Sequence, residues 1–468
     1  MYKSSLYKNL LVIGGNVAGL AAASQARRVS SDLNITVLES GEFISYGTCA
    51  LPYYISGIVK NIDDIFTYPV SFFEEKRKIK ILTNHKVVGI DLFKKEILVN
   101  VNNSYENKFF SYDKLVICSG ALPMQHSIPG INAKNVFHLR NVEDALNLKK
   151  YISLSSPSKA VVMGGGSIGL LAAEALNKLG IKVTIVEKAN KIFRDFDDEI
   201  STILHKKVKL DGIEIRTGCS VASINQDRTG KALSVSLSTK DENMAVDTDL
   251  VIVSTGIIAN TEFLSDTSIE LGVNKAIKVT PKLQSSQINI YAAGDCATVK
   301  NIITGKDDYI PTANNAAKMG RIAGENAAGG DLVFPGSVGT KTDKVFGLET
   351  AKVGLNLKDA SELGYDAFKI SGSYYSHASA VPGAETIIIT IIVDANSRKL
   401  LGAQMIGKEG VGKRIDIFAS AITSEMKIDD IYMLDLSYAP PVSTVWDPVN
   451  KICGKAILEL KKKRWSGL

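Results

Sequence analysis

The chain has 468 residues, of which 45% are hydrophobic and 22% charged, and its formal net charge is +6. This length predicts two to four domains, and the near-average composition argues against global disorder. The small net charge does not indicate a nucleic-acid partner, and no apolar run reaches the roughly 18 residues that a membrane span needs.

The predicted fold begins with a βαβ unit. An apolar strand over residues 10–13 runs into a glycine-rich turn, an alanine-rich helix follows, and a second strand over residues 35–38 ends at Glu39. This order is typical of dinucleotide sites, in which backbone N–H groups approach a pyrophosphate and the acidic residue binds a ribose. We predict FAD here, although asparagine replaces the second glycine of the motif and a tight turn without ligand is the alternative. The predicted contacts are Gly14, Gly15, Asn16, Ala18, Gly19 and Glu39.

Cys49 follows this unit, inside the segment YGTCALPYYISG of residues 46–57. A disulfide oxidoreductase with two redox cysteines would carry the second one five residues later, where this chain has Tyr54. Pro52 fits the first turn of a helix, where its missing N–H is not needed. We expect a single redox-active sulfur whose disulfide partner comes from another molecule. The helix start and a nearby flavin are expected to lower the pKa of the Cys49 thiol.

Three strand ends further along the chain are predicted to complete the cofactor sites. Strands over residues 112–117 and 249–253 run into turns of small residues, which let the backbone come close to a ligand. The strand over residues 290–293 is followed by an acidic residue, at the edge where open α/β sheets bind ligands. The predicted contacts outside the glycine turns are Val87, Ser119, Gly120, Gly256 and Asp295.

A second βαβ unit occupies residues 160–187 and contains a complete GxGxxG motif between a strand and a helix. It predicts a nicotinamide dinucleotide site. Glu187 ends the second strand of the unit and would accept from a ribose 2′-hydroxyl but repel a 2′-phosphate, which favours NADH. Basic residues at positions 188, 191 and 194 leave NADPH as an alternative. The predicted contacts are Gly164, Gly166, Ser167, Ile168, Gly169 and Glu187.

The cysteines and histidines indicate neither a disulfide framework nor a metal site. The cysteines are dispersed without a CxxC pair, which is typical of a reduced cytoplasmic protein. The histidines show no ligand spacing, so no metal is expected. The first strand begins near the N-terminus without a signal-peptide pattern, which also favours the cytoplasm. The dispersed cysteines are Cys49, Cys118, Cys219, Cys296 and Cys453.

Residues 46–57 resemble the corresponding segment of coenzyme A-disulfide reductases, single-cysteine members of the pyridine nucleotide-disulfide oxidoreductase superfamily. Residues 24–28, 408–416 and 438–441 are also similar, so the resemblance covers nearly the whole chain. It implies an α/β fold with two Rossmann-like domains, which bind FAD and NAD(P), and an α+β C-terminal dimerisation domain. We place the FAD-binding domain at residues 1–150 and 276–334, the NAD(P)H-binding domain at 151–275 and the C-terminal domain at 335–468.

The resemblance also implies a chemistry. NADH reduces FAD, the flavin splits a mixed disulfide between Cys49 and coenzyme A, and the freed thiolate attacks the next disulfide. Tyr438 would handle the departing coenzyme A thiolate from the partner subunit of a homodimer with a shared active site. Gln25, Arg28 and Thr48 would contact the substrate, with Arg27 as a further candidate for the coenzyme A phosphates.

Three departures from the family pattern leave the substrate open. The family commonly has Tyr-Tyr-Pro-Gly where this chain has Ala-Val-Pro-Gly at residues 380–383. Ser167 stands in place of a tyrosine that covers the flavin, and Thr48 in place of an asparagine. The acceptor is therefore coenzyme A disulfide, a persulfide or polysulfide, or another low-molecular-weight disulfide.

Two other functions compete with this interpretation. The first is an NADH oxidase or peroxidase that cycles Cys49 through sulfenic acid. Those relatives usually carry a histidine in the first glycine turn, where this chain has Val17, and lack the Leu-Pro-Tyr that follows Cys49. The second is a non-catalytic flavoprotein that responds to redox state through a partner.

Overall fold

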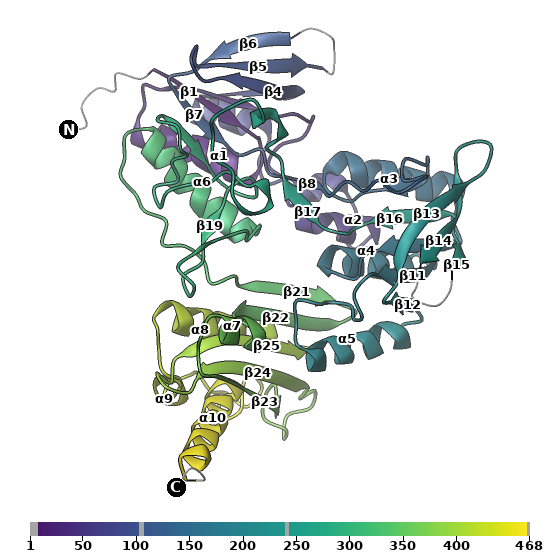
Figure 1. The fold of residues 1–468 in the computed structure, drawn as a ribbon, viewed down its shortest axis with the longest axis vertical. Helices are drawn as coiled ribbons and strands as arrows, with labels where there is room; N and C mark the ends of the chain where they lie inside the picture. Colours follow the sequence, from purple (N-terminus) through teal and green to yellow (C-terminus); the bar gives the residue numbers. More distant parts are fainter. Residues whose placement is uncertain (1–7, 103–106, 239–242, 466–468) are drawn as a thin grey trace.

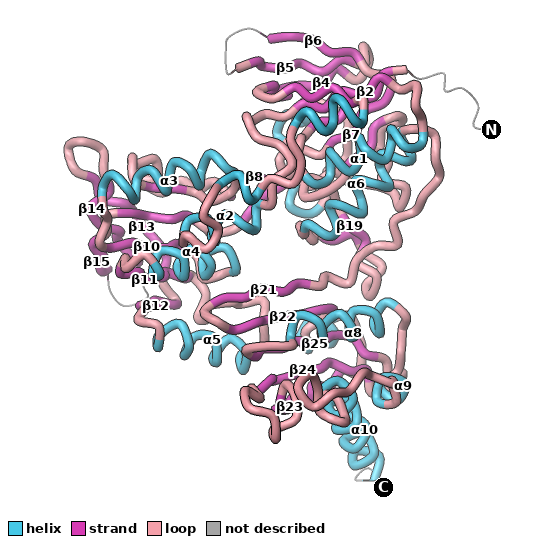
Figure 2. The backbone as a smooth tube through the Cα atoms, turned by 180° about the vertical axis from the view of Figure 1, so that it is seen from behind, coloured by secondary structure: helices cyan, strands magenta, loops and turns pink. Residues whose placement is uncertain are grey.

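The structure, a computed structural model, describes residues 8–102, 107–238 and 243–465. The elements form three units, each with its own buried core (Figure 1). The sheet of the first nucleotide unit is built from strands within residues 9–117 and 290–292, that of the second nucleotide unit from strands within 136–253, and that of the C-terminal unit from strands within 341–407. The two nucleotide units lie side by side, and the C-terminal unit lies beneath both of them. Figure 2 shows the same arrangement from behind.

The first nucleotide unit is built on a parallel five-stranded sheet whose buried strands carry apolar runs. β1 at the centre has four consecutive buried residues, as expected for a strand covered on both faces. A three-stranded antiparallel sheet is attached to it. The parallel sheet has the order β18 (Ile290–Ala292), β7 (Lys114–Ile117), β1 (Asn9–Ile13), β2 (Asn34–Leu38) and β3 (Ile79–Leu82). The antiparallel strands are β4 (His85–Asp91), β5 (Glu96–Val101) and β6 (Asn107–Ser111).

Helices α1 (Val17–Val29) and α6 (Ala313–Ala327) pack together although they are far apart in the sequence. Small residues explain the close approach. A Cβ at Gly320 or Gly324 would collide with the backbone of α1 at Ala18 and Ala22. Since α6 follows β18, this contact brings the second part of the first nucleotide unit onto the first part.

The second nucleotide unit repeats this plan. Its parallel sheet has the order β12 (Glu214–Thr217), β11 (Lys182–Glu187), β10 (Lys159–Met163), β16 (Leu250–Val253) and β9 (Val136–Phe137). Its antiparallel strands are β13 (Ser220–Gln226), β14 (Ala232–Ser238) and β15 (Asn243–Asp247). Its helices are α3 (Val142–Ser155), α4 (Ser167–Lys178) and α5 (Asp198–Leu210).

The boundary between the two nucleotide units differs from the one expected at residue 150. Strand β9 pairs with β16, and Val142, Ala145 and Leu148 of α3 are buried in the core of the second nucleotide unit. The chain crosses between the units at β8 (Ala121–Pro123), which pairs antiparallel with β17 (Ile257–Ala259). The unit therefore begins before its fingerprint, because a short strand and a helix precede the βαβ pattern.

The C-terminal unit is α+β. One face of its antiparallel sheet carries helices α8 (Val411–Thr423) and α10 (Pro448–Trp465), and apolar residues of both helices join the core beneath the sheet. The sheet has the order β21 (Lys341–Val345), β22 (Leu348–Gly354), β25 (Leu400–Gly407), β24 (Thr386–Asp394) and β23 (Ala367–Tyr375). Two short helices, α7 (Leu357–Glu362) and α9 (Ile428–Tyr432), also belong to this unit. Outside it, α2 (Leu51–Ile55) packs in the core of the second nucleotide unit, and β19 (Val299–Lys300) pairs with β20 (Asp307–Asp308).

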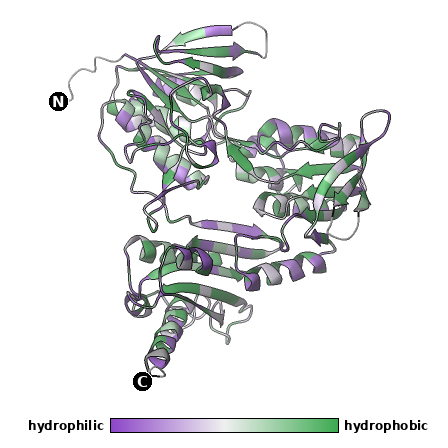
Figure 3. Ribbon diagram, in the orientation of Figure 1, coloured by the Kyte–Doolittle hydropathy of each residue, from purple (hydrophilic) through white to green (hydrophobic). Residues whose placement is uncertain are grey.

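The edge strand β21 is mostly hydrophilic (Figure 3) and runs beneath both nucleotide units. Across the described part of the chain, no helix combines the length and apolarity required to cross a membrane.

Candidate functional site

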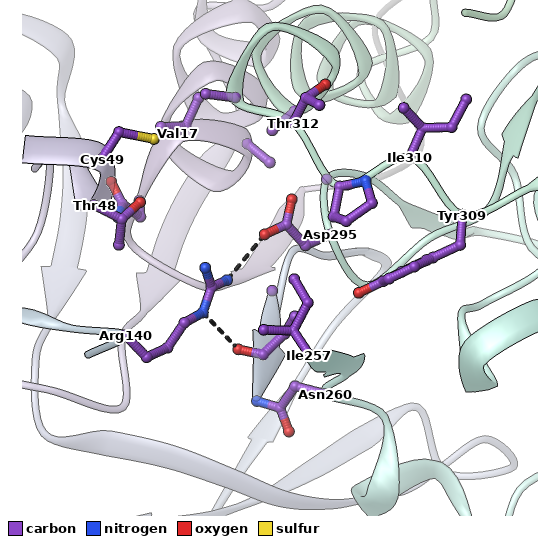
Figure 4. A pocket seen from close by; sticks show the side chains of 18 of the residues that line it. Val17, Thr48, Cys49, Arg140, Ile257, Asn260, Asp295, Tyr309, Ile310 and Thr312 are labelled. Carbon is purple, nitrogen blue, oxygen red and sulfur yellow. Dashed lines mark hydrogen bonds and ion pairs between the residues drawn. The ribbon is translucent and has the colours of Figure 1, made fainter. Parts of the chain in front are cut away.

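A cavity of about 2030 Å³ lies where the three units meet. Its lining comes from the first glycine turn, the Cys49 segment, the start of α4 and strand β21. Figure 4 shows part of this wall, with Cys49 and Thr48 on one side and the Arg140–Asp295 pair nearby. A cavity of this size has room for a large cofactor together with a substrate.

The first glycine turn is held by the acidic residue at the end of β2. Glu39 accepts hydrogen bonds from the backbone N–H groups of Gly15, at 2.7 Å, and of Gly41, at 2.9 Å. Gly14 has a φ of +107°, and a Cβ there would collide with the carbonyl of Cys118. Only glycine therefore fits at position 14, where the turn before α1 passes the residue that follows β7.

The second glycine turn repeats this arrangement. Glu187, at the end of β11, accepts from the N–H groups of Gly165, at 2.7 Å, and of Ala189, at 2.8 Å. Gly164 has a φ of +105° and approaches Ser254 as Gly14 approaches Cys118. A Cβ at Gly166 would meet nothing within 4 Å, so the open side of this turn is free for a ligand.

Polar groups in the cavity wall fit an FAD molecule. Arg140 donates to Asp295 at 2.9 Å and to the carbonyl of Ala121 at 2.9 Å (Figure 4). Asn16 Oδ1, Tyr309 Oη and Thr312 Oγ1 are buried without a hydrogen-bond partner among the described residues. Since buried polar atoms are nearly always paired, these orphans indicate a polar ligand beside them.

Cys49 lies in a single 3₁₀ turn, Thr48–Ala50, directly before α2. Its side chain is exposed in the cavity wall, whereas the other four cysteines are buried. The protein's own groups raise the pKa of the Cys49 thiol, first through burial and then through Asp343, while Arg140 lowers it. The lowering expected from the helix start is not found, because burial dominates, α2 has only five residues and the carboxylate of Asp343 adds to the effect of burial.

The neighbouring arginines Arg27 and Arg28 have different environments. Arg27 donates to five backbone carbonyl groups, which fixes its guanidinium inside the unit and removes it as a candidate phosphate ligand. Arg28 is exposed and donates to Gln25 at 3.0 Å. Burial, Arg77 and Arg321 lower the pKa of Arg28, so three guanidinium groups gather at this place. Such a cluster suits an anionic ligand.

Tyr438 lies outside the cavity of its own chain, on an exposed loop of the C-terminal unit. Two contacts hold this loop. Pro440 accepts from the N–H of Ala378 at 3.0 Å, and a buried ion pair joins Arg414 to Asp447 at 2.9 Å. The first contact brings the loop close to residues 380–383, where the family tyrosines are replaced.

The predicted site residues fall into two groups. One group lines the cavity: Gly14, Asn16, Ala18, Glu39, Thr48, Cys49, Val87, Ser119, Gly120, Ser167, Ile168 and Asp295. The second group does not line it: Gly15, Gly19, Gln25, Arg28, Gly164, Gly166, Gly169, Glu187, Gly256 and Tyr438.

Sequence reasoning missed many residues of the wall, and four of these carry polar or charged side chains that shape the site. Arg140, Tyr309, Thr312 and Asp343 all line the cavity, but none belongs to a motif. Thr312 directly precedes α6, and this helix start is the one signal that could have pointed to it.

Two family models match the chain. The model of pyridine nucleotide-disulphide oxidoreductases covers residues 8–320, and the model of their dimerisation domain covers residues 342–448. Together they cover nearly all of the residues in the three units.

Curated relatives align over almost their whole length. An NAD(P)H coenzyme A polysulfide/persulfide reductase of Pyrococcus horikoshii is 33% identical over 95% of this chain and 97% of its own. An NADH oxidase of Methanocaldococcus jannaschii is 31% identical over 97% and 99%. A coenzyme A disulfide reductase of Staphylococcus haemolyticus is 30% identical over 96% and 99%.

A crystal structure of reduced Bacillus anthracis CoADR-RHD superimposes on the chain with a TM-score of 0.94. It is 34% identical and covers 98% of this chain and 82% of its own. The whole arrangement of three units is therefore shared with the CoADR-RHD protein.

Proposed function

The chain belongs to the pyridine nucleotide-disulphide oxidoreductases, and we propose that it uses NADH and FAD to reduce coenzyme A disulfide or a coenzyme A persulfide at Cys49. One observation carries the proposal. A single exposed cysteine stands in the wall of a cavity that also receives the first glycine turn and the start of α4. The coenzyme A polysulfide/persulfide and disulfide reductases among its relatives support the substrate class.

Cys49 performs the sulfur chemistry. Its thiolate attacks one sulfur of a disulfide R–S–S–R, forms Cys49–S–S–R and releases the other half as a thiolate, R–S⁻. When bound, FAD supplies the two-electron transfer from NADH that returns this mixed disulfide to two thiols. The first glycine turn with Glu39 would hold FAD, together with Asn16, Asp295, Tyr309 and Thr312.

The pyridine nucleotide is assigned to the second glycine turn. Glu187 would accept from the adenosine 2′-hydroxyl, which favours NADH over NADPH. Ser167 opens α4 on the cavity wall, so a dinucleotide held by this turn would reach toward the flavin site.

The coenzyme A nucleotide is assigned to the arginine cluster around Arg28. Burial and then the nearby guanidinium groups of Arg77 and Arg321 lower the pKa of Arg28 at the end of α1. The phosphates of coenzyme A would relieve this repulsion, because guanidinium groups bind phosphate through paired N–H donors. Gln25 positions Arg28 and is itself fixed by Glu325 at 2.6 Å.

The functional unit is proposed to be a homodimer. The dimerisation-domain match and the exposed Tyr438, which lies outside its own cavity, both support this assembly. Tyr438 of the partner subunit would then complete the site and donate a hydrogen bond to the departing thiolate.

The test is stopped-flow reduction by NADH, followed by reoxidation with coenzyme A disulfide, coenzyme A persulfide, peroxide or oxygen. We expect the wild type to be reoxidised through its sulfur by coenzyme A substrates. Cys49→Ser should keep NADH-dependent flavin reduction and lose disulfide turnover by orders of magnitude. Wild-type turnover that persists in Cys49→Ser would refute the role of Cys49.

An NADH oxidase or peroxidase is the second candidate, since one relative is called an NADH oxidase and an exposed thiol forms sulfenic acid readily. Fast reoxidation of the wild type by peroxide or oxygen, with coenzyme A disulfide inert, would favour it. A non-catalytic flavoprotein has no support among the relatives named here, all of which are called enzymes.

A further inference from the structure

Asp343 of β21 brings a carboxylate from the C-terminal unit into the wall of the cavity that contains Cys49. Ser167 Oγ donates to Asp343 Oδ2 at 2.8 Å, so the first residue of α4 fixes this carboxylate. Lys341 Nζ lies 3.8 Å from the same oxygen, and the Asp343 side chain is only 13% exposed. A partly buried charge of this kind acts more strongly on its surroundings than a solvated one.

The carboxylate of Asp343 is offset less closely than that of Asp295, because Lys341 lies 3.8 Å from Asp343 whereas Arg140 lies 2.9 Å from Asp295. After burial, Asp343 is the strongest influence that raises the pKa of the Cys49 thiol; Arg140 lowers it and Asp295 raises it. Arg140 and Asp295 are paired with each other at 2.9 Å, so their opposite charges largely offset. Asp343 also raises the pKa of Tyr53, one turn of chain beyond Cys49, after burial and Glu174. The geometry agrees, because the hydroxyl of Tyr53 in α2 donates to the carbonyl of Lys344, the residue after Asp343, at 3.5 Å and so holds this end of β21 against the helix that follows Cys49.

We propose that Asp343, fixed by Ser167, is a specificity-determining residue that disfavours acceptors carrying negative charge to Cys49, such as polysulfide anions, relative to uncharged disulfide groups. The inference rests on the proposed function, because it concerns the acceptor of the same sulfur. In the attack, Cys49–S⁻ and R–S–S–R give Cys49–S–S–R and R–S⁻. An anionic acceptor must bring an additional charge to Cys49, and Asp343 opposes that approach.

Alkylation of Cys49 tests the charge effect without any disulfide substrate. The holoenzyme is reduced with dithiothreitol, desalted without oxygen and reacted with uncharged iodoacetamide or anionic iodoacetate; each reaction forms the thioether and releases iodide. The other four cysteines are buried, so the rates report on Cys49. Asp343→Asn should raise the ratio of the iodoacetate to the iodoacetamide rate about three- to tenfold.

The pH profile supplies a second readout. Because burial and then Asp343 raise the pKa of the Cys49 thiol, the iodoacetamide rate of the wild type should rise only at a pH above the ordinary range of a thiol. The profile of Asp343→Asn should shift to lower pH. Ser167→Ala, which leaves β21 unchanged, should move the ratio in the same direction by less, and it carries the test if Asp343→Asn does not retain flavin.

Asp195→Asn is the matched control, because Asp195 also lines the cavity but is not among the groups that act on Cys49. It should keep the wild-type ratio. A ratio in Asp343→Asn or Ser167→Ala equal to that of the control would overturn the proposal. With polysulfide and coenzyme A disulfide as acceptors, Asp343→Asn should raise the relative kcat/KM for polysulfide severalfold. Absence of all disulfide turnover in the wild type would sink the proposed function, while the alkylation ratio would still decide the role of Asp343.

Discussion

Two neighbouring arginines show how residues of one type divide between a structural role and a proposed binding role. The Arg27 guanidinium connects the end of α1 to carbonyl groups of residues 30–33 and 77–78. The Arg28 side chain points to solvent beside other arginines. A charge pattern in the sequence cannot separate these roles, because it does not show which carbonyl groups the fold brings within reach.

Substitution should separate the two arginines. Arg27→Ala leaves several carbonyl groups without their donor and should lower the free energy of unfolding by roughly 2–3 kcal/mol. Arg28→Ala should change stability by less than about 0.5 kcal/mol and raise the KM for coenzyme A disulfide. Urea unfolding and steady-state kinetics measure the two effects. An equal loss of stability in both variants would contradict this division.

The site residues that sequence could predict are those with a local motif. The contacts of Glu39 and Glu187 with their glycine turns could be expected, because each ends a strand roughly 20–25 residues after the turn begins, a spacing that follows from the βαβ unit. Asp343 was not found. It lies on a strand of another unit, and only the tertiary fold brings it to Ser167.

At the scale of elements, the contact between α1 and α6 depends on the absence of side chains. Gly324→Val would place a branched side chain against the backbone of α1 at Ala22. We expect this overpacking to lower the free energy of unfolding by about 1–3 kcal/mol. Lys318→Ala, at an exposed position of the same helix, is the control and should be nearly neutral. Urea unfolding followed by flavin fluorescence measures both effects. A Gly324→Val variant with the stability of the wild type would show that α1 and α6 are not closely packed at this position.

The parallel strands were predicted because buried strands carry continuous apolar runs, and the observed β1, β7, β10 and β16 lie where such runs occur. Strand β9 was not predicted. It has only two residues, and it pairs with β16 of the second nucleotide unit shortly before α3 begins. Short strands give no periodic signal, so this boundary between the nucleotide units could not be read from the sequence.

At the scale of the whole molecule, the loop that carries Tyr438 exposes large apolar side chains. Val442 and Val445 are 63% and 71% exposed. Val445→Asp should shift a dimer toward monomer in sedimentation at micromolar concentration and reduce turnover, since a buried unpaired charge opposes association. Phe93→Asp, at a still more exposed position of the first nucleotide unit, should leave the assembly unchanged. A monomeric wild type would refute the shared site.

Polar contacts connect the second nucleotide unit to the C-terminal unit. Gln404 accepts from the N–H of Asp197 at 2.7 Å and donates to its carboxylate at 3.1 Å. Ser167 and Asp343 form a second such contact. The cavity wall is therefore assembled from three units by specific hydrogen bonds, which no property of a single segment predicts.

The carboxylates of Glu39 and Glu187 already fasten their own glycine turns. Each nucleotide then arrives at a preorganised loop and need not spend binding energy on ordering it. The affinity that such a loop saves is available for discrimination, and in the proposed binding mode the carboxylate oxygens that fasten the loop would also accept hydrogen bonds from the sugar. Loss of one carboxylate would therefore weaken recognition and loosen the receptor in a single step.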